Sequence, residues 1–279
     1  TVRTPPRTLS KRPASTMLVE RALLVARACS LAFLPPYAIP YSPYATDLRC
    51  IGQVEDPQSL SGATILACPD DEVIIACRGS SNIRNFRTNF DIGPVPLETS
   101  DGDRIQLGGQ VHSGFQKAAQ QLWQQVEPQL PPTGRLTVTG HSLGGAIASR
   151  GAAEVAAAGK YKVQLFTYGS PRVGNKAWAK WASDTIAATN GTASLRMRRQ
   201  KDIVPAIPPR SIGFEHIPTE IYNKHSDGQN DTYVVCNGSG EDSSCGDSEE
   251  WPPFPLDLLH MKPSEHTRYM GFQGGNCND

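Results

Sequence analysis

A mainly parallel α/β sheet with helices on both faces is the fold that the sequence predicts. Strand-like and helical segments alternate along the middle of the chain, and no linker divides its 279 residues. Strands that alternate with helices pair in parallel, because each helical crossover returns the chain to the same edge of the sheet. We therefore expect one domain over residues 14–279. The Pro-rich, basic segment 1–13 is expected to be a flexible arm or the remnant of a pro-segment.

The individual elements follow from periodicity and turn residues. A helix over 15–33 is predicted by apolar residues at helical spacing, namely Leu18, Ala22, Val25, Cys29 and Ala32. Two apolar runs, 62–68 and 72–78, flank Pro69-Asp70-Asp71 and predict a hairpin. Downstream, helices and strands are expected to alternate over 113–127, 135–140, 143–158, 163–168, 174–188 and 194–199.

Charge and hydropathy exclude two classes of partner. The chain has 27 Lys and Arg against 27 Asp and Glu, a net charge of +0. It therefore lacks the general attraction to nucleic acid that a basic protein has. The apolar stretch 22–34 contains Arg27 and is shorter than the roughly 20 residues that span a bilayer. We predict no nucleic-acid partner and no integral membrane span.

The cysteines and glycosylation signals indicate a compartment. Seven cysteines occur without a CxxC pair or a Cys/His cluster, so we expect no metal site. Three N-glycosylation sequons begin at Asn190, Asn230 and Asn237. Together these features favour a secreted, disulfide-bonded protein over a reduced one with three accidental sequons. The odd cysteine count leaves at least one thiol unpaired within the chain.

A candidate nucleophile lies in the motif Gly140-His141-Ser142-Leu143-Gly144, between an expected strand and an Ala-rich expected helix. A serine on so tight a strand-to-helix turn has a strained backbone, and the residues two positions away must be small. The helix N-terminus then favours a developing oxyanion. This pattern predicts an α/β-hydrolase fold with Ser142 as the nucleophile of a serine hydrolase.

A serine nucleophile needs a histidine base and a carboxylate, which in this fold follow it in the order acid, then histidine. Asp202 follows the expected strand 194–199 and precedes Ile203-Val204-Pro205, so it lies at a strand's carboxyl end, where sites collect. The base remains open on these grounds. Four histidines follow Ser142, namely His216, His225, His260 and His266. A late position in the chain favours the last two of these.

The chain resembles the fungal class 3 lipases, the filamentous-fungal triacylglycerol lipases, from about residue 20 to residue 277. Six segments match in order: RGSSNIRNF at 78–86, VHSGF at 111–115, VTGHSLGGA at 138–146, YGSPRVGN at 168–175, DIVPAIPP at 202–209 and HTRYMG at 266–271. The resemblance implies Asp202 as the acid and His266 as the base, because the family's histidine has an aromatic residue three positions on, here Tyr269. It makes His112 a structural histidine.

The resemblance also implies an oxyanion hole and a lid. Ser80 would contribute its N–H and hydroxyl, and Leu143 its N–H. A short helical lid would cover the site at about 82–91, with Ile83, Phe86 and Phe90 on its apolar face. A helix packed permanently on the core is the alternative. Phe86 stands where the family often has tryptophan, and the segment 245–265 is longer than the family pattern.

Disulfides can be assigned partly from the same likeness. Cys29 and Cys277 match the family's long-range bridge, and Cys236 and Cys245 match its local loop bridge. The remaining three have no counterpart there. We expect Cys50 to pair with Cys68, which leaves Cys77 as a free thiol buried in a strand.

The resemblance implies a triacylglycerol lipase that acts on lipid or ester substrates at an oil–water interface through an acyl-enzyme, without metal or organic cofactor. We expect it to be secreted and monomeric. A feruloyl or other soluble-substrate esterase is one alternative, although the apolar lid face argues against a fixed polar lid. Phospholipase or galactolipase activity is equally open. A catalytically inactive lipid-binding protein is the alternative from another class. Acyl-chain length and positional preference stay undetermined.

Overall fold

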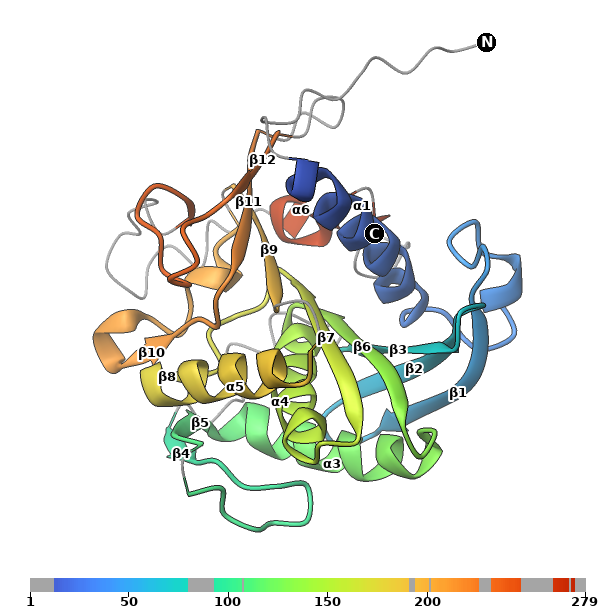
Figure 1. The fold of residues 1–279 in the computed structure, drawn as a ribbon, viewed down its shortest axis with the longest axis horizontal. Coiled ribbons are helices and arrows are strands. Elements are labelled where there is room, and N and C mark those ends of the chain that lie inside the picture. Colours follow the sequence, from blue (N-terminus) through green and yellow to red (C-terminus); the bar gives the residue numbers. More distant parts are fainter. Residues whose placement is uncertain are drawn as a thin grey trace.

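An eight-stranded sheet is the centre of the part of the chain that the computed structural model describes, residues 13–79, 93–106, 108–190, 194–200, 202–225, 232–246, 263–270 and 272–273 (Figure 1). In spatial order its strands are β1 (Arg49–Asp56), β2 (Ser61–Ala67), β3 (Glu72–Arg78), β6 (Gly134–His141), β7 (Tyr161–Tyr168), β9 (Leu195–Arg199), β11 (Glu220–His225) and β12 (Thr232–Val235). The strands from β3 to β11 run parallel, while β1 and β2 at one edge and β12 at the other pair antiparallel. The predicted fold class is confirmed.

Helices cover both faces of this sheet. Helix α1 (Pro13–Leu31) lies on one face, and the other is covered by α3 (Ser113–Val126), α4 (Leu143–Ala157) and α5 (Lys176–Ala188) (Figure 1). Strand β7 shows how the sequence serves both faces, because alternate side chains of a strand point in opposite directions. Val163 and Leu165 join the core under α3, α4 and α5, whereas Phe166 and Tyr168 join the core under α1.

Small residues in α4 bring the helices close together. A Cβ on Gly151 would lie 1.7 Å from Trp123 of α3, so only glycine leaves room for that indole. Trp123 is fully buried and donates its Nε1–H to the carbonyl of Ile147 at 3.4 Å. The Ala-rich sequence that follows the nucleophile motif therefore lets α4 pack tightly between its neighbours.

Short elements complete the described part. A second sheet has the order β10 (Phe214–Glu215), β8 (Gly174–Asn175), β5 (Gln110–His112) and β4 (Pro94–Pro96), and a third pairs β13 (Arg268–Tyr269) with β14 (Phe272–Gln273). The short helices are α6 (Pro263–Thr267), η1 (Ile39–Tyr41), η2 (Glu127–Gln129), η3 (Val204–Ala206) and η4 (Arg210–Ile212). α6 and β13 carry the chain past the candidate base.

The expected elements match the structure closely. The hairpin is β2 and β3, and each of the seven other expected helices and strands begins and ends within about three residues of an observed one. Helix α1 begins at Pro13, the last residue of the expected arm, and residues 1–12 lie outside the described part. No helix among the described residues is long and apolar enough to cross a bilayer. The division into one arm and one domain stays a prediction.

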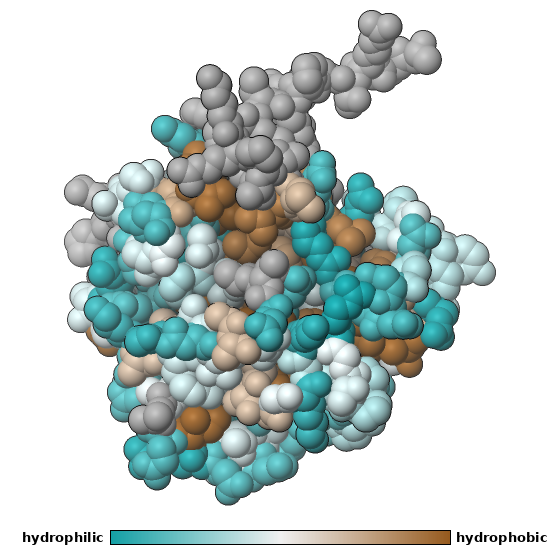
Figure 2. Space-filling model, in the orientation of Figure 1, coloured by the Kyte–Doolittle hydropathy of each residue, from teal (hydrophilic) through white to brown (hydrophobic). Residues whose placement is uncertain are grey.

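The visible surface is mainly hydrophilic (Figure 2). Hydrophobic residues gather where β11 and β12 lie beside the start of α1. Met17, Val234 and Val235 are among the exposed large hydrophobic side chains.

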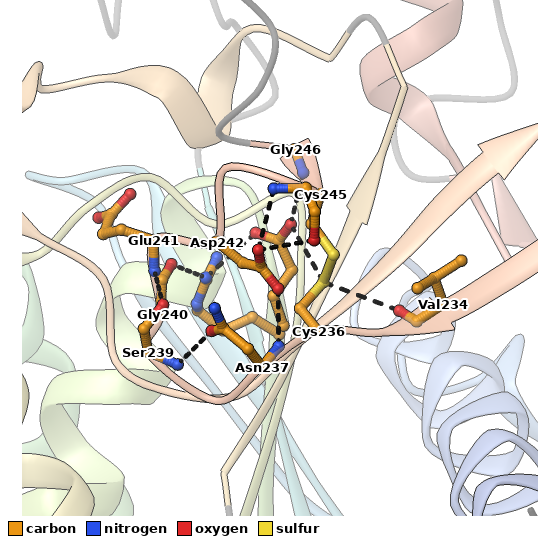
Figure 3. Close-up of a disulfide and its surroundings, with 12 residues drawn as sticks. Val234, Cys236, Asn237, Ser239, Gly240, Glu241, Asp242, Cys245 and Gly246 are labelled. Atoms are coloured by element: carbon orange, nitrogen blue, oxygen red, sulfur yellow. Dashed lines mark hydrogen bonds and ion pairs between the residues drawn. A yellow bond between two sulfur atoms is a disulfide. The ribbon is translucent and has the colours of Figure 1, made fainter.

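One of the three expected disulfides forms. Cys236 and Cys245 are bonded, with their Cα atoms 6.2 Å apart (Figure 3). The expected pairing of Cys29 with Cys277 is not formed, because Cys29 is a free thiol packed in the core under α1; Cys277 itself lies outside the described residues. The pairing of Cys50 with Cys68 is also wrong. Cys50 lies opposite Leu66 in the β1–β2 ladder, so Cys68 is a diagonal neighbour at about 7–8 Å, beyond the usual Cα separation of a disulfide. Cys77 is free and buried, as expected.

Candidate active site

Ser142 lies at the turn between β6 and α4. Its backbone has φ 58° and ψ −127°, a conformation that residues other than glycine rarely adopt. Its N–H donates to the carbonyl of Tyr168 on β7 at 3.0 Å, and its own carbonyl accepts the N–H of Gly145 at 2.9 Å. The strained turn is therefore held on both sides, as expected for a strand-to-helix elbow.

The glycines of the motif are sterically required. A Cβ on Gly140 would lie 2.2 Å from the carbonyl oxygen of Gly144, and a Cβ on Gly144 would lie 2.2 Å from that of Cys77. At Gly145, a Cβ would lie 2.8 Å from the Cβ of Ser170. The expectation that small residues must surround Ser142 is confirmed.

The end of β3 passes directly beside the first turn of α4. A Cβ on Gly79 would lie 2.6 Å from the Cβ of Leu143 and 2.9 Å from the nitrogen of Gly144. Leu143 is the first residue of α4, so its N–H has no acceptor within the helix. Ser80 is the next residue after Gly79 but lies outside the described residues, as do the expected lid residues, Ile83, Phe86 and Phe90.

His266 and Asp202 form a buried pair, although 64 positions separate them in sequence. The Nδ1 atom of His266 lies 3.0 and 2.9 Å from the two carboxylate oxygens of Asp202. Neither side chain is exposed to solvent. Asp202 follows β9, and His266 is carried by α6, so the pair joins two elements that only the tertiary fold brings together.

The surroundings of Asp202 keep it ionised. Burial alone would raise its pKa, but the charge and hydrogen bond of His266, the hydroxyl of Tyr269 and the N–H of Val204 outweigh burial and lower the pKa below its ordinary value. The Val204 N–H donates to Oδ1 at 3.0 Å, and the Tyr269 hydroxyl donates to Oδ2. A carboxylate so held fixes both the tautomer and the direction of the imidazole.

The second ring nitrogen of His266 faces the opposite way from Asp202 and is available for proton transfer. Nε2 is buried and has no hydrogen-bond partner among the residues that the structure describes. Both residues are described, and Ser142 Oγ makes no hydrogen bond to this nitrogen. Such bonds are often long in unliganded sites and tighten with substrate.

His141 supports His266 from the strand side, a role that the sequence analysis missed. Its Nε2–H donates to the backbone carbonyl of His266 at 2.7 Å, and the two rings lie 4.5 Å apart. Burial, and next the neighbouring charge of His266, lowers the pKa of His141 to about 3. His141 therefore stays neutral beside the candidate base. Its position directly before the nucleophile is the only sequence signal that could have suggested this role.

The other histidines have different positions. His216 is buried, donates Nε2–H to the carbonyl of Pro205 at 2.7 Å, and has a pKa lowered well below its ordinary value by burial and then by neighbouring arginines. His112 caps α3, because its Nδ1 accepts the N–H of Gly114 at 3.1 Å, so the expectation of a structural role is confirmed. The side chain of His225 and all of His260 lie outside the described residues.

Two groups of side chains within the described residues have metal-ligand spacing, and neither resembles a metal centre. One consists of Glu220 with Cys236 and Cys245, whose sulfurs are bonded to each other. The other consists of Cys68, Asp70 and Glu72, in which Asp70 pairs with Arg135 and Glu72 with Arg21.

A strained serine between a central parallel strand and a buried helix, followed in the chain by a strand-end aspartate and a late histidine, defines an α/β hydrolase. Comparison with known proteins narrows this class. The sequence profile of the family Lipase (class 3) matches residues 74–212. The chain belongs to this family, the fungal class 3 lipases.

Individual relatives agree with this result. The chain is 35% identical over 157 residues to a secreted mono- and diacylglycerol lipase of Fusarium solani, across 54% of this chain and 44% of that protein. It is 30% identical over 214 residues to a lipase of Rhizomucor miehei, across 74% of this chain and 53% of that protein. The chain thus spans about half the length of these curated relatives.

A solved structure extends the likeness to the whole fold. It belongs to a triacylglycerol lipase whose catalytic centre is formed by a serine protease triad. Its TM-score against this chain is 0.73 at 25% identity, and the alignment covers 98% of this chain and 99% of that one.

Proposed function

We propose that the chain is a secreted carboxylester hydrolase that cleaves acylglycerols at a lipid–water interface. The observation that carries the proposal is the buried Asp202–His266 pair. Its His266 Nε2 has no hydrogen-bond partner among the described residues, and the fold also holds Ser142 on a strained turn. These three side chains supply the nucleophile, the base and the orienting carboxylate that acyl transfer from an ester to water needs, and oxyanion donors complete the site.

In the proposed mechanism, Ser142 Oγ attacks the ester carbonyl carbon while His266 Nε2 takes the hydroxyl proton. Asp202 keeps the ring oriented and stabilises the imidazolium that forms. The tetrahedral intermediate collapses as the imidazolium returns its proton to the leaving alcohol, which gives an acyl-enzyme. A water molecule then repeats both steps, and the carboxylic acid leaves with Ser142 restored.

The negative charge on the tetrahedral oxygen requires donors. We propose the N–H of Leu143, which heads α4, together with the N–H and hydroxyl of Ser80. The close approach of Gly79 to Leu143 supports this pairing, because Ser80 directly follows Gly79. Loss of one such donor typically lowers kcat by about 10²–10³-fold.

Interfacial action is proposed from the sequence of the segment 82–91, in which Ile83, Phe86 and Phe90 would form an apolar face over the site in water and meet lipid at a surface. Secretion is supported by the disulfide and by the secreted relative from Fusarium. That relative acts on mono- and diacylglycerols, so partial glycerides are candidate substrates alongside triacylglycerols.

One experiment tests the nucleophile, the substrate class and the interfacial action. The initial rate is measured with a short-chain triglyceride through its solubility limit, and with emulsified mono-, di- and triacylglycerols, using Ser142→Ala as the control. A steep rise once the emulsion forms, absent in the control, is the expected result. Smooth saturation below the limit would instead indicate an esterase of soluble substrates. Activity that persists in Ser142→Ala would refute the assigned nucleophile.

A further inference from the structure

The disulfide Cys236–Cys245 closes a surface loop that is braced from within (Figure 3). Asp242 accepts the N–H of Asn237 at 2.7 Å and that of Ser244 at 2.9 Å. The side chain of Asn237 accepts the N–H of Ser239 at 2.9 Å. The N–H of Glu241 donates to the Ser239 hydroxyl at 3.2 Å. The backbone at Glu241 is therefore fixed by the loop.

The carboxylate of Glu241 points away from this loop into the protein and binds two residues. Oε1 accepts the Arg172 Nε–H at 2.8 Å and the backbone N–H of His216 at 2.8 Å, while Oε2 accepts an Arg172 Nη2–H at 2.8 Å. The side chains of Arg172 and Glu241 are only 4% and 6% exposed. Burial would raise the pKa of Glu241, but the hydrogen bonds and charge of Arg172 outweigh burial and lower it. Glu241 is thus a buried anion with three donors.

Arg172 and His216 also donate to one segment, residues 205–208. Arg172 Nη1 donates to the carbonyls of Ala206 at 2.6 Å and Pro208 at 3.3 Å. The backbone N–H of Arg172 donates to the carbonyl of Ile207 at 2.9 Å. His216 donates Nε2–H to the carbonyl of Pro205 at 2.7 Å. Four consecutive carbonyls, from Pro205 to Pro208, are therefore held by two residues that share Glu241.

This segment begins beside Asp202. Val204, which opens η3, directly precedes Pro205, and its N–H donates to Asp202 Oδ1 at 3.0 Å. Displacing the segment would therefore move a donor of the carboxylate that orients His266. Glu241 bridges Arg172 and His216 with a single buried carboxylate oxygen, Oε1.

We propose that Glu241 is a positioning residue for Asp202, acting through Arg172 and His216, and that the disulfide-closed loop holds Glu241 in position. The inference rests on the proposed role of Asp202 in the triad. It adds to that role the loop 236–245, whose cysteines match the family's local loop bridge but which lies outside the six matching segments.

The test compares Glu241→Gln with the wild type and with Ser243→Ala, an exposed change in the same loop. The substrate is p-nitrophenyl butyrate below its solubility limit, so that neither lipid binding nor an interface contributes. Misplacement of catalytic groups by about 1 Å costs on the order of 10²-fold in rate, so we expect kcat to fall by about 10- to 100-fold while KM changes less than about twofold. Ser243→Ala should match the wild type.

A second readout distinguishes positioning from mere stability. The Nδ1–H proton of His266 in its bond to Asp202 is followed as a far-downfield proton resonance, at a temperature well below the measured Tm of each variant. We expect the resonance to broaden or disappear in Glu241→Gln and to persist in Ser243→Ala. The double variant Cys236→Ser/Cys245→Ser should shift kcat and the resonance in the same direction. Should Glu241→Gln fail to fold, Arg172→Lys, which keeps a charge for Glu241 but loses carbonyl contacts, is measured instead.

A Glu241→Gln protein with a lower Tm but unchanged kcat and unchanged resonance would overturn the proposal. An unchanged double cysteine variant would overturn the part assigned to the disulfide. Failure of the proposed function is separately visible, because phosphonylation of Ser142 by a soluble organophosphonate needs the triad but no acylglycerol. A wild type that is phosphonylated yet cleaves no acylglycerol would refute the substrate only, and the effect of Glu241→Gln on the phosphonylation rate would still decide the inference.

Discussion

The ring of His141 donates its Nε2–H to the backbone carbonyl of His266 at 2.7 Å, with the two ring centres 4.5 Å apart. The residue before the candidate nucleophile therefore supports the candidate base, and burial keeps its imidazole neutral. Its pKa of about 3, against an ordinary value of 6.5, reflects mainly burial. This difference has a consequence for stability in acid.

We predict that His141 makes the fold acid-sensitive. The unfolded chain binds a proton at His141 near pH 6.5 and the folded chain only near pH 3. Between these values the unfolded state carries more protons, so stability falls as pH falls, by at most about 1.4 kcal/mol per pH unit. His141→Gln should be less stable than the wild type at pH 7.5, and the gap in Tm should narrow steadily toward pH 4.5. A gap that stays constant across this range would contradict the prediction.

A second prediction concerns Tyr269, whose hydroxyl donates to Asp202 and accepts the N–H of Arg199 at 3.3 Å. Tyr269→Phe removes a hydrogen bond to a buried charge, which is typically worth about 1.5–3 kcal/mol, and it should raise the pKa of Asp202. We expect kcat to fall by about tenfold or more. Urea unfolding should show that the free energy of unfolding falls by about 1.5–3 kcal/mol. The matched control is Tyr161→Phe, which removes a 2.7 Å bond to Pro131 but should leave kcat unchanged. Equal kcat values for the two variants would exclude a role for the Tyr269 hydroxyl in the site.

The third prediction tests the steric origin of the glycines beside Ser142. In Gly144→Ala the new methyl group would lie 2.2 Å from the carbonyl oxygen of Cys77 on β3, which is backbone and cannot rotate away. Overpacking of this kind typically costs about 1–3 kcal/mol. A shift of the elbow should lower kcat with soluble esters by about 10²-fold. Gly93→Ala is the control, because a Cβ there meets nothing within 4 Å. Wild-type activity in Gly144→Ala would show that the elbow tolerates more volume than its geometry suggests.

The fold and two of the three candidate triad residues could be predicted from local sequence. Alternating strands and helices are local signals, and so are the small residues around Ser142 and the strand-end position of Asp202. The base could not be chosen in this way, because four histidines follow Ser142 and only their tertiary partners distinguish them. His266 is paired with Asp202, whereas His216 is committed to the carbonyl of Pro205. A late position in the chain favoured His260 and His266, and the family resemblance alone chose His266 between them.

Other features depend on contacts that no local pattern encodes. The Arg172–Glu241 pair joins residues 69 positions apart. The pairing of Cys50 with Cys68 failed because an interstrand register, which includes a bulge after Cys50, sets them diagonally. Cys29 has the helical spacing that predicts burial on α1, and its thiol packs in that core as a free cysteine.

The last prediction concerns how α1 is attached to the sheet. Arg21 of α1 pairs with the buried carboxylate of Glu72 on β3, whose side chain is 6% exposed, and it also donates to Thr137 at 3.0 Å. Arg21→Met leaves Glu72 as a buried charge without its cation, which typically costs about 3–5 kcal/mol, whereas replacing both partners with apolar residues is often nearly neutral. We therefore expect Arg21→Met/Glu72→Leu to be more stable than Arg21→Met in urea unfolding. Lys180→Met, which breaks an exposed pair with Asp184, is the control and should change stability by less than about 1 kcal/mol. A double variant less stable than the single one would mean that Glu72 is held chiefly by Thr137, so that its charge is not the reason α1 depends on Arg21.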